Sequence, residues 1–242
     1  MKVTNIIICG ALLACSVFVL SCFKNPPEVV VENNDFGDKT LVQVFNATVN
    51  STGTTHVFVD GSPVTGAALT YGTLFPSSAY AFAINAGLRS FTIRSTSAGT
   101  TQTPIVFSEN MVSGKNYTIF MYDTITAAKQ VTVVSDIVIP TDNKARVRFA
   151  NFIYNSSDVP GVDVFSKLRN ENVFTNVLRT QVTGYIPFAS GVSDTLIVRE
   201  TGTLNQLALS AFNPIQKRSY TLIYRGNHKV AANRVLSSFA NN

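Results

Sequence analysis

The chain has 242 residues and a formal net charge of +5; 45% of its residues are apolar and only 14% are charged. Intrinsically disordered chains combine low hydrophobicity with high net charge, so this composition excludes disorder over most of the length. With 2 His, 3 Cys and no Trp, few residues remain for a histidine-based catalytic centre or a multi-ligand metal site.

The first 21 residues have the organisation of a secretory signal peptide. Lys2 precedes an uncharged apolar run over residues 6–20, which is shorter than the roughly 20 residues that a transmembrane helix requires. The run ends at Val19-Leu20-Ser21-Cys22, which resembles the lipobox of bacterial lipoproteins. That resemblance implies diacylation of Cys22 and lipid anchoring in the cell envelope, and Phe23 after the cysteine favours the outer membrane.

A second match to the lipobox, Leu12-Leu13-Ala14-Cys15, leaves the choice of lipidated residue open between Cys22 and Cys15. We favour Cys22 because cleavage at Cys15 would leave an apolar run in the mature chain. An ordinary secretory signal with a coincidental cysteine is the remaining alternative. Cleavage before Cys22 removes Cys9 and Cys15, so no pair remains for a disulfide.

Residues 22–39 predict a solvated tether. They contain Pro26-Pro27, two basic and four acidic residues, and Val29-Val30-Val31 as their main apolar content. Such a segment has too little apolar surface to fold by itself.

Beyond residue 39, short runs rich in Thr, Val and Phe alternate with Gly, Asn, Asp, Ser and Pro, which is the pattern of an all-β protein. No stretch has a convincing helical period. The predicted strands are 41–47, 56–59, 80–85, 90–95, 105–109, 116–122, 130–134, 145–152, 162–165, 185–188, 195–200, 206–211, 219–224 and 233–238.

The first seven strands and the last seven form two similar series. Equivalent residues lie about 105 positions apart, and the matching pairs are Asn46 with Asn151, His56 with Asp163, Tyr80 with Tyr185, Arg94 with Arg199, and Tyr117 with Tyr220. Seven short strands in about 100 residues suit a two-sheet sandwich. We therefore expect two tandem immunoglobulin-like β-sandwich domains, over residues 40–139 and 140–242.

The second domain is the basic one, since residues 140–242 hold 12 basic and 6 acidic residues against 4 and 4 in residues 40–139. Alternation over residues 144–149 places Arg146 and Arg148 on one strand face, which we expect to be solvated. Such a face could attract an acidic glycan, a lipid headgroup or an envelope protein; the alternative is a face without a ligand. Nucleic acid is not an expected partner, because no recognition motif is present.

A family resemblance rests on the same region. The strand Ala145-Arg146-Val147-Arg148-Phe149, the loop at Asn155 to Gly161 and the strand Val162-Asp163-Val164-Phe165 resemble the opening of domain of unknown function family 4397. The first copy keeps the aromatic strand and the Asp60-Gly61 turn but has His56 in place of the aspartate. The resemblance implies bacterial envelope proteins with immunoglobulin-like β domains, and it supplies no catalytic residue.

Asn155, Asp158 and Asp163 are further candidate binding residues. Oxygen ligands at the start of a strand could hold calcium, but the spacing fits no calcium-loop signature, and an Asx-type turn is the favoured interpretation. No metal or cofactor is therefore expected. His56 and His228 lack an accompanying nucleophile motif and are expected to be surface or loop residues.

The tyrosines that recur between the two copies, Tyr80 with Tyr185 and Tyr117 with Tyr220, favour core packing with the hydroxyl group reaching an edge partner. Exposed tyrosines could instead stack on sugar rings. The sequence thus favours a non-catalytic envelope lipoprotein that binds glycan or protein. The alternatives are a carbohydrate-active enzyme, or an accessory to one, with carboxylates between the domains, and a structural or adhesion subunit that assembles through β edges.

Overall fold

The computed structural model describes residues 37–51, 53–135, 137 and 139–241. The predicted signal peptide, Cys22 and the tether up to residue 36 lie outside the described residues. The chain from Phe36 to Asn242 forms one compact unit. Within the described ranges, no helix has the length and apolarity needed to cross a membrane.

The fold is all-β, as predicted. The strands of the first half are β1 (Lys39–Asn46), β2 (Thr55–Val59), β3 (Ser62–Pro63), β4 (Leu74–Phe75), β5 (Phe82–Asn85), β6 (Gly87–Ser95), β7 (Ile105–Met111), β8 (Asn116–Tyr122) and β9 (Lys129–Val134). Those of the second half are β10 (Ala145–Tyr154), β11 (Val162–Ser166), β12 (Glu171–Val177), β13 (Ile186–Phe188), β14 (Asp194–Glu200), β15 (Gln206–Phe212), β16 (Ser219–Asn227) and β17 (Val235–Ala240). Single 3₁₀ turns, η1 (Ile125–Ala127) and η2 (Ala231–Asn233), precede the last strand of each half.

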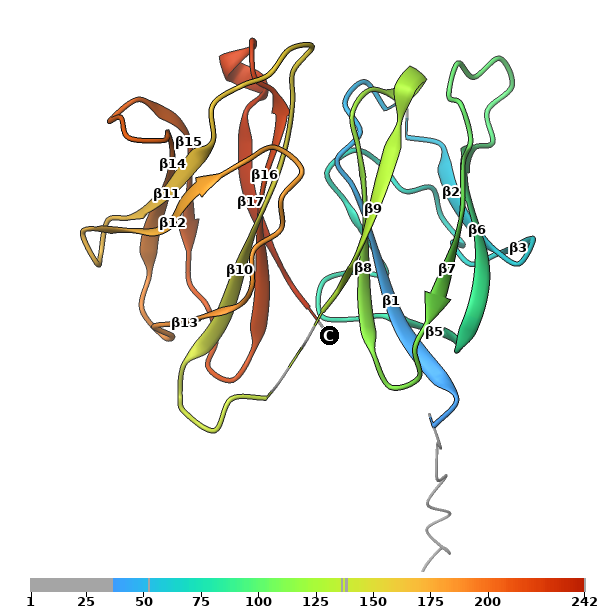
Figure 1. Ribbon diagram of the computed structural model, residues 1–242, viewed down its shortest axis with the longest axis horizontal. Coiled ribbons are helices and arrows are strands. Elements are labelled where there is room, and N and C mark those ends of the chain that lie inside the picture. The colour runs from blue at the N-terminus through green and yellow to red at the C-terminus, as the bar shows by residue number, and fades with distance from the viewer. Residues whose placement is uncertain (1–36, 52, 136, 138, 242) are drawn as a thin grey trace, which may run out of the picture. The chain divides into compact units, whose positions relative to one another are not determined.

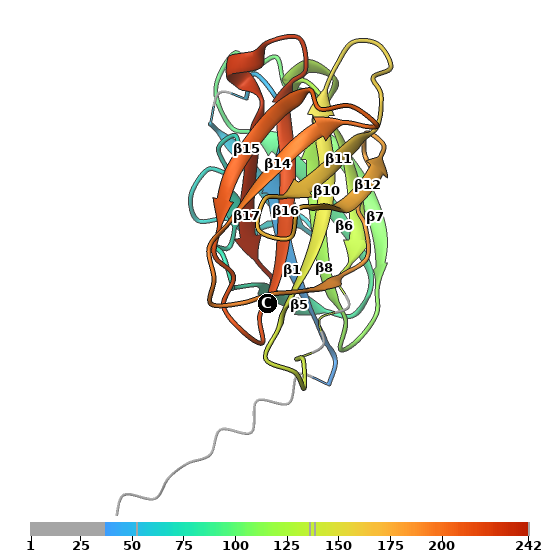
Figure 2. The ribbon, with the colours of Figure 1, turned by 90° about the vertical axis from the view of Figure 1, so that its left-hand side faces the viewer.

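Each half consists of two sheets with the same strand order. The first half has an outer sheet β3-β2-β6-β7 and an inner sheet β4-β1-β8-β9, with β5 also pairing with β1. The second half has an outer sheet β12-β11-β14-β15 and an inner sheet β13-β10-β16-β17. Figures 1 and 2 show the four sheets as successive layers, with the two inner sheets next to each other.

The pairing registers repeat as well. Val42 lies opposite Tyr117 in the parallel pair β1–β8, and Val147 lies opposite Tyr220 in the parallel pair β10–β16. These are the equivalences read from the sequence repeat. Alternate apolar residues fill one core between the two sheets of each half.

A third buried cluster joins the two inner sheets. The Phe120 ring stacks on Phe152 with 4.8 Å between centroids, and the Phe45 ring stacks on Phe239 at 5.3 Å. Ala47, Ala150 and Ile223 complete the cluster. The inner strands are therefore covered on both faces, and β1 and β10 are buried along most of their length, polar residues included.

This packing corrects the expectation of a solvated basic face on β10. Arg148 is only 1% exposed. Its Nε donates to Thr221 Oγ1 at 2.9 Å, and its Nη2 donates to Thr118 Oγ1 at 3.0 Å and to Ser135 Oγ at 2.9 Å. The residue thus bridges the halves, because the face that alternation assigned to solvent is covered by the other inner sheet.

Strand β12 is absent from the sequence prediction. Its residues, Glu-Asn-Val-Phe-Thr-Asn-Val, are mostly polar and exposed, with only Phe174 and Val177 buried. The strand is held at the sheet edge by backbone pairing with β11 and by Asp163, whose carboxylate accepts bonds from Asn172 Nδ2 at 3.1 Å and from the Asn176 N–H at 2.8 Å.

Candidate functional site

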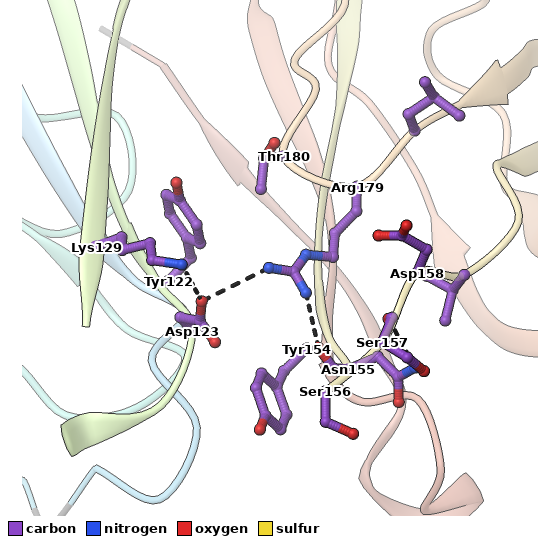
Figure 3. Close-up of a pocket in the computed structure, with 12 residues that line it drawn as sticks. Tyr122, Asp123, Lys129, Tyr154, Asn155, Ser156, Ser157, Asp158, Arg179 and Thr180 are labelled. Atoms are coloured by element: carbon purple, nitrogen blue, oxygen red, sulfur yellow. Dashed lines mark hydrogen bonds and ion pairs between the residues drawn. The ribbon is translucent and has the colours of Figure 1, made fainter. Parts of the chain in front are cut away.

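A cleft of about 860 Å³ lies where the two inner sheets diverge at one end of the molecule. Strands β8 and β10 run in the same direction: Thr118 of β8 bonds Arg148 of β10, and four residues later on each strand Tyr122 contacts Phe152. Both strands end at this cleft, which we call the junction cleft (Figure 3). Its lining residues are Tyr122, Asp123, Lys129, Tyr154, Asn155, Ser156, Ser157, Asp158, Val159, Leu178, Arg179 and Thr180.

An ion network crosses the junction cleft. Figure 3 shows the Arg179 side chain extending from the second half toward Asp123 of the first. Arg179 Nη2 lies 3.6 Å from Asp123 Oδ2, and Lys129 Nζ lies 3.0 Å from the same oxygen. Arg179 Nη1 also donates to the Asn155 carbonyl at 2.8 Å. The guanidinium is therefore fixed in orientation, and the network links strands from both halves.

Two half-buried tyrosines line the cleft, one from each half. Tyr122 is the last residue of β8 and packs on Phe152 with 5.4 Å between ring centroids. Tyr154 is the last residue of β10. Both tyrosines belong to strands that pack at the interface between the halves. Their rings therefore present apolar surface to the cleft from fixed positions.

Asn155 and Asp158 stand in the turn that closes one side of the cleft. Asn155 Nδ2 donates a hydrogen bond to the Ser157 carbonyl oxygen at 2.9 Å and another to Ser157 Oγ at 3.1 Å. The buried Asn155 Oδ1 has no hydrogen-bond partner among the described residues. The Asx-type turn expected here, in which a side-chain oxygen accepts a hydrogen bond from a nearby backbone N–H, is therefore wrong: the Asn155 amide group acts as a donor instead. Asp158 is exposed and its carboxylate accepts no hydrogen bond from described residues, so it can accept one from a ligand.

The structure brings Asn155 and Asp158 together and places the other sequence candidates elsewhere. Asp163 lies outside the cleft, buried, with its carboxylate bonded to Asn172, Asn176, Thr201 Oγ1 at 3.1 Å and the Gly202 N–H at 3.2 Å. It ties together the loops around β11 and acts structurally. Arg146 lies at the opposite end of β10, where it pairs with Asp142 at 3.1 Å. Among the described residues, no group of three or more metal-ligating side chains occurs.

The sequence did not predict that four of the lining residues form one site: Tyr122, Asp123, Lys129 and Arg179. Asp123 and Arg179 are far apart in sequence and belong to different copies, so no local motif joins them. Asp123 follows an apolar strand with a positive φ of 77°, and its largely buried carboxylate lines the cleft.

A second, smaller cleft is related to the first by the repeat. It has about 300 Å³ and is lined by Val49, Asn50, Tyr71, Gly226, Asn227, Ala232, Asn233 and Val235. The loop hydrogen bonds of Gly72 to Asn46 and of Thr180 to Asn151 are equivalent, which makes Tyr71 the counterpart of Arg179. Next to this cleft, Arg225 lies over the Tyr71 ring at 4.7 Å.

Neither histidine lines the junction cleft or the smaller cleft that is related to it by the repeat. His56 Nδ1 lies 3.2 Å from Thr65 Oγ1 on the outer sheet. His228 is half-buried in the β16–β17 connection, and burial, with a smaller contribution from the Arg234 charge, lowers its pKa below the usual value of 6.5. Its environment therefore favours the neutral imidazole.

No model of a known protein family matches the chain, and no curated protein matches its sequence. Among solved structures, it is similar to one described as "Alpha-glucan binding by a streptococcal virulence factor", at 12% sequence identity and a TM-score of 0.25, over 84% of this chain and 97% of that chain. A TM-score of 0.25 does not establish that the two proteins share an arrangement of strands or a ligand. The resemblance to family 4397 stays a prediction.

Proposed function

We propose that the protein is a non-catalytic cell-envelope lipoprotein, held in the outer membrane through acylated Cys22, that binds a glycan in the junction cleft. The observation that carries the binding proposal is the convergence of Tyr122 and Tyr154 with polar groups of both kinds. Lys129 and Arg179 donate hydrogen bonds, whereas Asp123 and Asp158 accept them. Sugars present apolar ring faces and hydroxyl groups that both donate and accept.

The balance of charges in the cleft indicates the kind of glycan. The two cations, Lys129 and Arg179, pair with Asp123 within the network, and Asp158 supplies the second negative charge, so the charges of the lining residues balance. An uncharged sugar is therefore better matched than an acidic one.

Binding can be tested by titrating the fragment of residues 37–242 with a panel of neutral oligosaccharides in a calorimeter. Tyr154→Ser removes one aromatic face, and Asp158→Asn removes a charged acceptor; each is expected to weaken binding about tenfold. Tyr80→Ser is the control, because Tyr80 is exposed and lies outside the cleft. Equal losses in Tyr154→Ser and Tyr80→Ser would contradict the assignment of the cleft.

The anchor requires the full chain and a separate experiment. In cells fed with a labelled fatty acid, the full-length protein is expected to incorporate label, Cys22→Ala to incorporate none, and Cys15→Ala to incorporate the normal amount. Label that is lost in Cys15→Ala and kept in Cys22→Ala would assign the anchor to Cys15.

A second candidate, a glycoside hydrolase, follows from Asp123 and Asp158 lining the same cleft. Asp123 is engaged in two ion pairs with cations that also face the cleft, which favours a binding role for it. The two functions are separated by incubating the fragment with any oligosaccharide that it binds. Release of reducing ends that is lost in Asp123→Asn would favour the hydrolase.

A further inference from the structure

The end of the molecule opposite the junction cleft carries a set of features that repeats in both halves. Two turns lie there: the β7–β8 turn, residues 112–115, and the β15–β16 turn, residues 213–218. We call them the basal turns. Because β1 is parallel to β8 and β10 is parallel to β16, these turns lie beside the starts of β1 and β10 (Figure 1).

Both basal turns are held in the same way. The Gly114 N–H donates to the Lys39 carbonyl at 2.8 Å, and the Lys217 N–H donates to the Lys144 carbonyl at 3.0 Å. In addition, the Val112 N–H donates a hydrogen bond to the Tyr117 hydroxyl at 3.0 Å. In the second half, the Ile215 N–H donates to the Tyr220 hydroxyl, also at 3.0 Å. Tyr117 and Tyr220 therefore have the edge partners that were expected for them, whereas the expectation of core packing is wrong for Tyr80, which is 65% exposed.

Each turn presents an aliphatic tip to solvent. Val112 is 50% exposed and Ile215 is 53% exposed. Between the halves at this end, Tyr80 is 65% exposed and Ile139 is 76% exposed, and they line a shallow groove together with Lys217 and Arg218. Isolated exposed apolar residues are common, but a tip that recurs in both halves and is held each time by a tyrosine hydroxyl is a positioned feature.

Cations surround these tips. Lys39 and Lys144 begin the two halves, and Lys115 and Arg218 are equivalent residues of the two turns. Asp38 pairs with Lys39, and Asp142 pairs with Arg146. Lys144, Lys217 and Arg218 are exposed and form no salt bridge with described residues, so positive charge is left facing solvent.

We propose that the basal turns dock on an anionic phospholipid bilayer, with Val112, Ile215 and Tyr80 entering the headgroup layer and Lys144, Lys217 and Arg218 contacting lipid phosphates. A negatively charged surface with an apolar layer beneath it matches two aliphatic tips that lie at the same end of the molecule among exposed cations. Tyrosine is favoured at that depth because its ring is apolar and its hydroxyl polar. The described chain also begins here, since Ser113 Oγ donates to the Gly37 carbonyl.

The docking can be tested without any lipid anchor. Residues 37–241 contain all the strands and all three buried clusters of the described unit, so a fragment of residues 37–242 keeps the fold and lacks Cys22. Its binding is measured by cosedimentation with vesicles of phosphatidylglycerol and phosphatidylethanolamine, and with vesicles of phosphatidylcholine alone, at 20 mM and 500 mM salt.

We expect binding to the anionic vesicles at low salt, and at least a tenfold loss at high salt because the exposed charges are screened. Lys217→Gln combined with Arg218→Gln should weaken binding about twenty-five-fold, at roughly fivefold for each cation. Val112→Ser combined with Ile215→Ser should weaken it about tenfold through lost apolar burial.

The matched control is Arg94→Gln combined with Lys229→Gln, which removes the same net charge from exposed sites at the far ends of β6 and β16, away from the basal turns. It should bind within twofold of the unchanged fragment. The proposal is overturned if the control loses as much binding as the basal variant, or if the fragment binds phosphatidylcholine as well as it binds the anionic vesicles. Because the fragment has no anchor and the junction cleft is at the other end, neither outcome bears on the proposed glycan binding.

Discussion

Gln43 and Arg148 occupy the same position of the repeat but connect the halves with different chemistry. Gln43 lies opposite Thr118 on β8, and Arg148 lies opposite Thr221 on β16. Gln43 Oε1 accepts from Asn241 at 3.1 Å, and Arg148 donates to Ser135, the residue equivalent to Asn241. The contacts are reciprocal, as in an isologous dimer. One copy uses a neutral amide and the other a cation.

The two clefts differ in the same way. In the junction cleft, Arg179 faces Asp123 across the halves, whereas at the repeat-related cleft Tyr71 faces Arg225. The first combination leaves charged groups around an open volume. The second fills the space with a stacked pair, and the cleft is correspondingly smaller. Equivalent frameworks can therefore hold an open polar site on one side and a closed contact on the other.

The largest expected effect comes from removing the cation at the interface. Arg148→Ala should lower the free energy of unfolding by about 3 kcal/mol, because it empties buried volume and leaves the hydroxyls of Thr118, Ser135 and Thr221 short of a donor. Gln43→Ala, the matched change in the first half, should cost about 1.5 kcal/mol. Urea unfolding of fragment 37–242 measures both; equal losses would mean that the two positions contribute alike.

A second test concerns the loop that closes the smaller cleft. Gly72 has a φ of 77°, and an added Cβ would lie 2.7 Å from Arg225 Cζ. Gly72→Ala should therefore destabilise the fold by about 2 kcal/mol and displace Arg225 from Tyr71. Thermal unfolding measures the loss. An unchanged midpoint would show that Arg225 moves aside without cost.

Thr180 is the equivalent loop residue of the second half, and a substitution there is expected to raise the stability of the fold. Thr180 has a φ of 68°, a conformation that is unfavourable for a β-branched residue. Thr180→Gly should stabilise the fold by up to about 1 kcal/mol, since relief of backbone strain exceeds the added freedom of the unfolded chain. If the midpoint falls instead, the Thr180 side chain contributes contacts that outweigh its strain.

The smallest expected effect is a dependence of the free energy of unfolding on pH, caused by His228 in the second half. The lowered pKa of His228 means that the unfolded chain binds a proton more readily than the folded chain does. Stability should therefore decrease as the pH falls below about 6.5, where the unfolded imidazole titrates. His228→Gln should flatten this part of the stability profile, measured by urea unfolding between pH 5 and 7.5. A slope that persists in the variant would assign it to other groups.

Much of the strand content and the repeat could be predicted from the sequence, because apolar alternation and turn residues are local signals. Asp60-Gly61 forms the β2–β3 turn with φ of 49° and 81°, as its composition indicates. The environment of Arg148 could not be predicted, since alternation separates two strand faces without showing whether water or another sheet covers the second. Nor could the junction cleft, because Asp123 and Arg179 meet only after the two inner sheets have packed.

The reciprocal contacts around Gln43 and Arg148 have a consequence for how the molecule can change. In a symmetric dimer of identical chains, each substitution at such an interface appears twice and must be tolerated in both places. Here both copies lie on one polypeptide, so each position can mutate independently. The arrangement allows one cleft to specialise while its counterpart preserves the packing that holds the pair together.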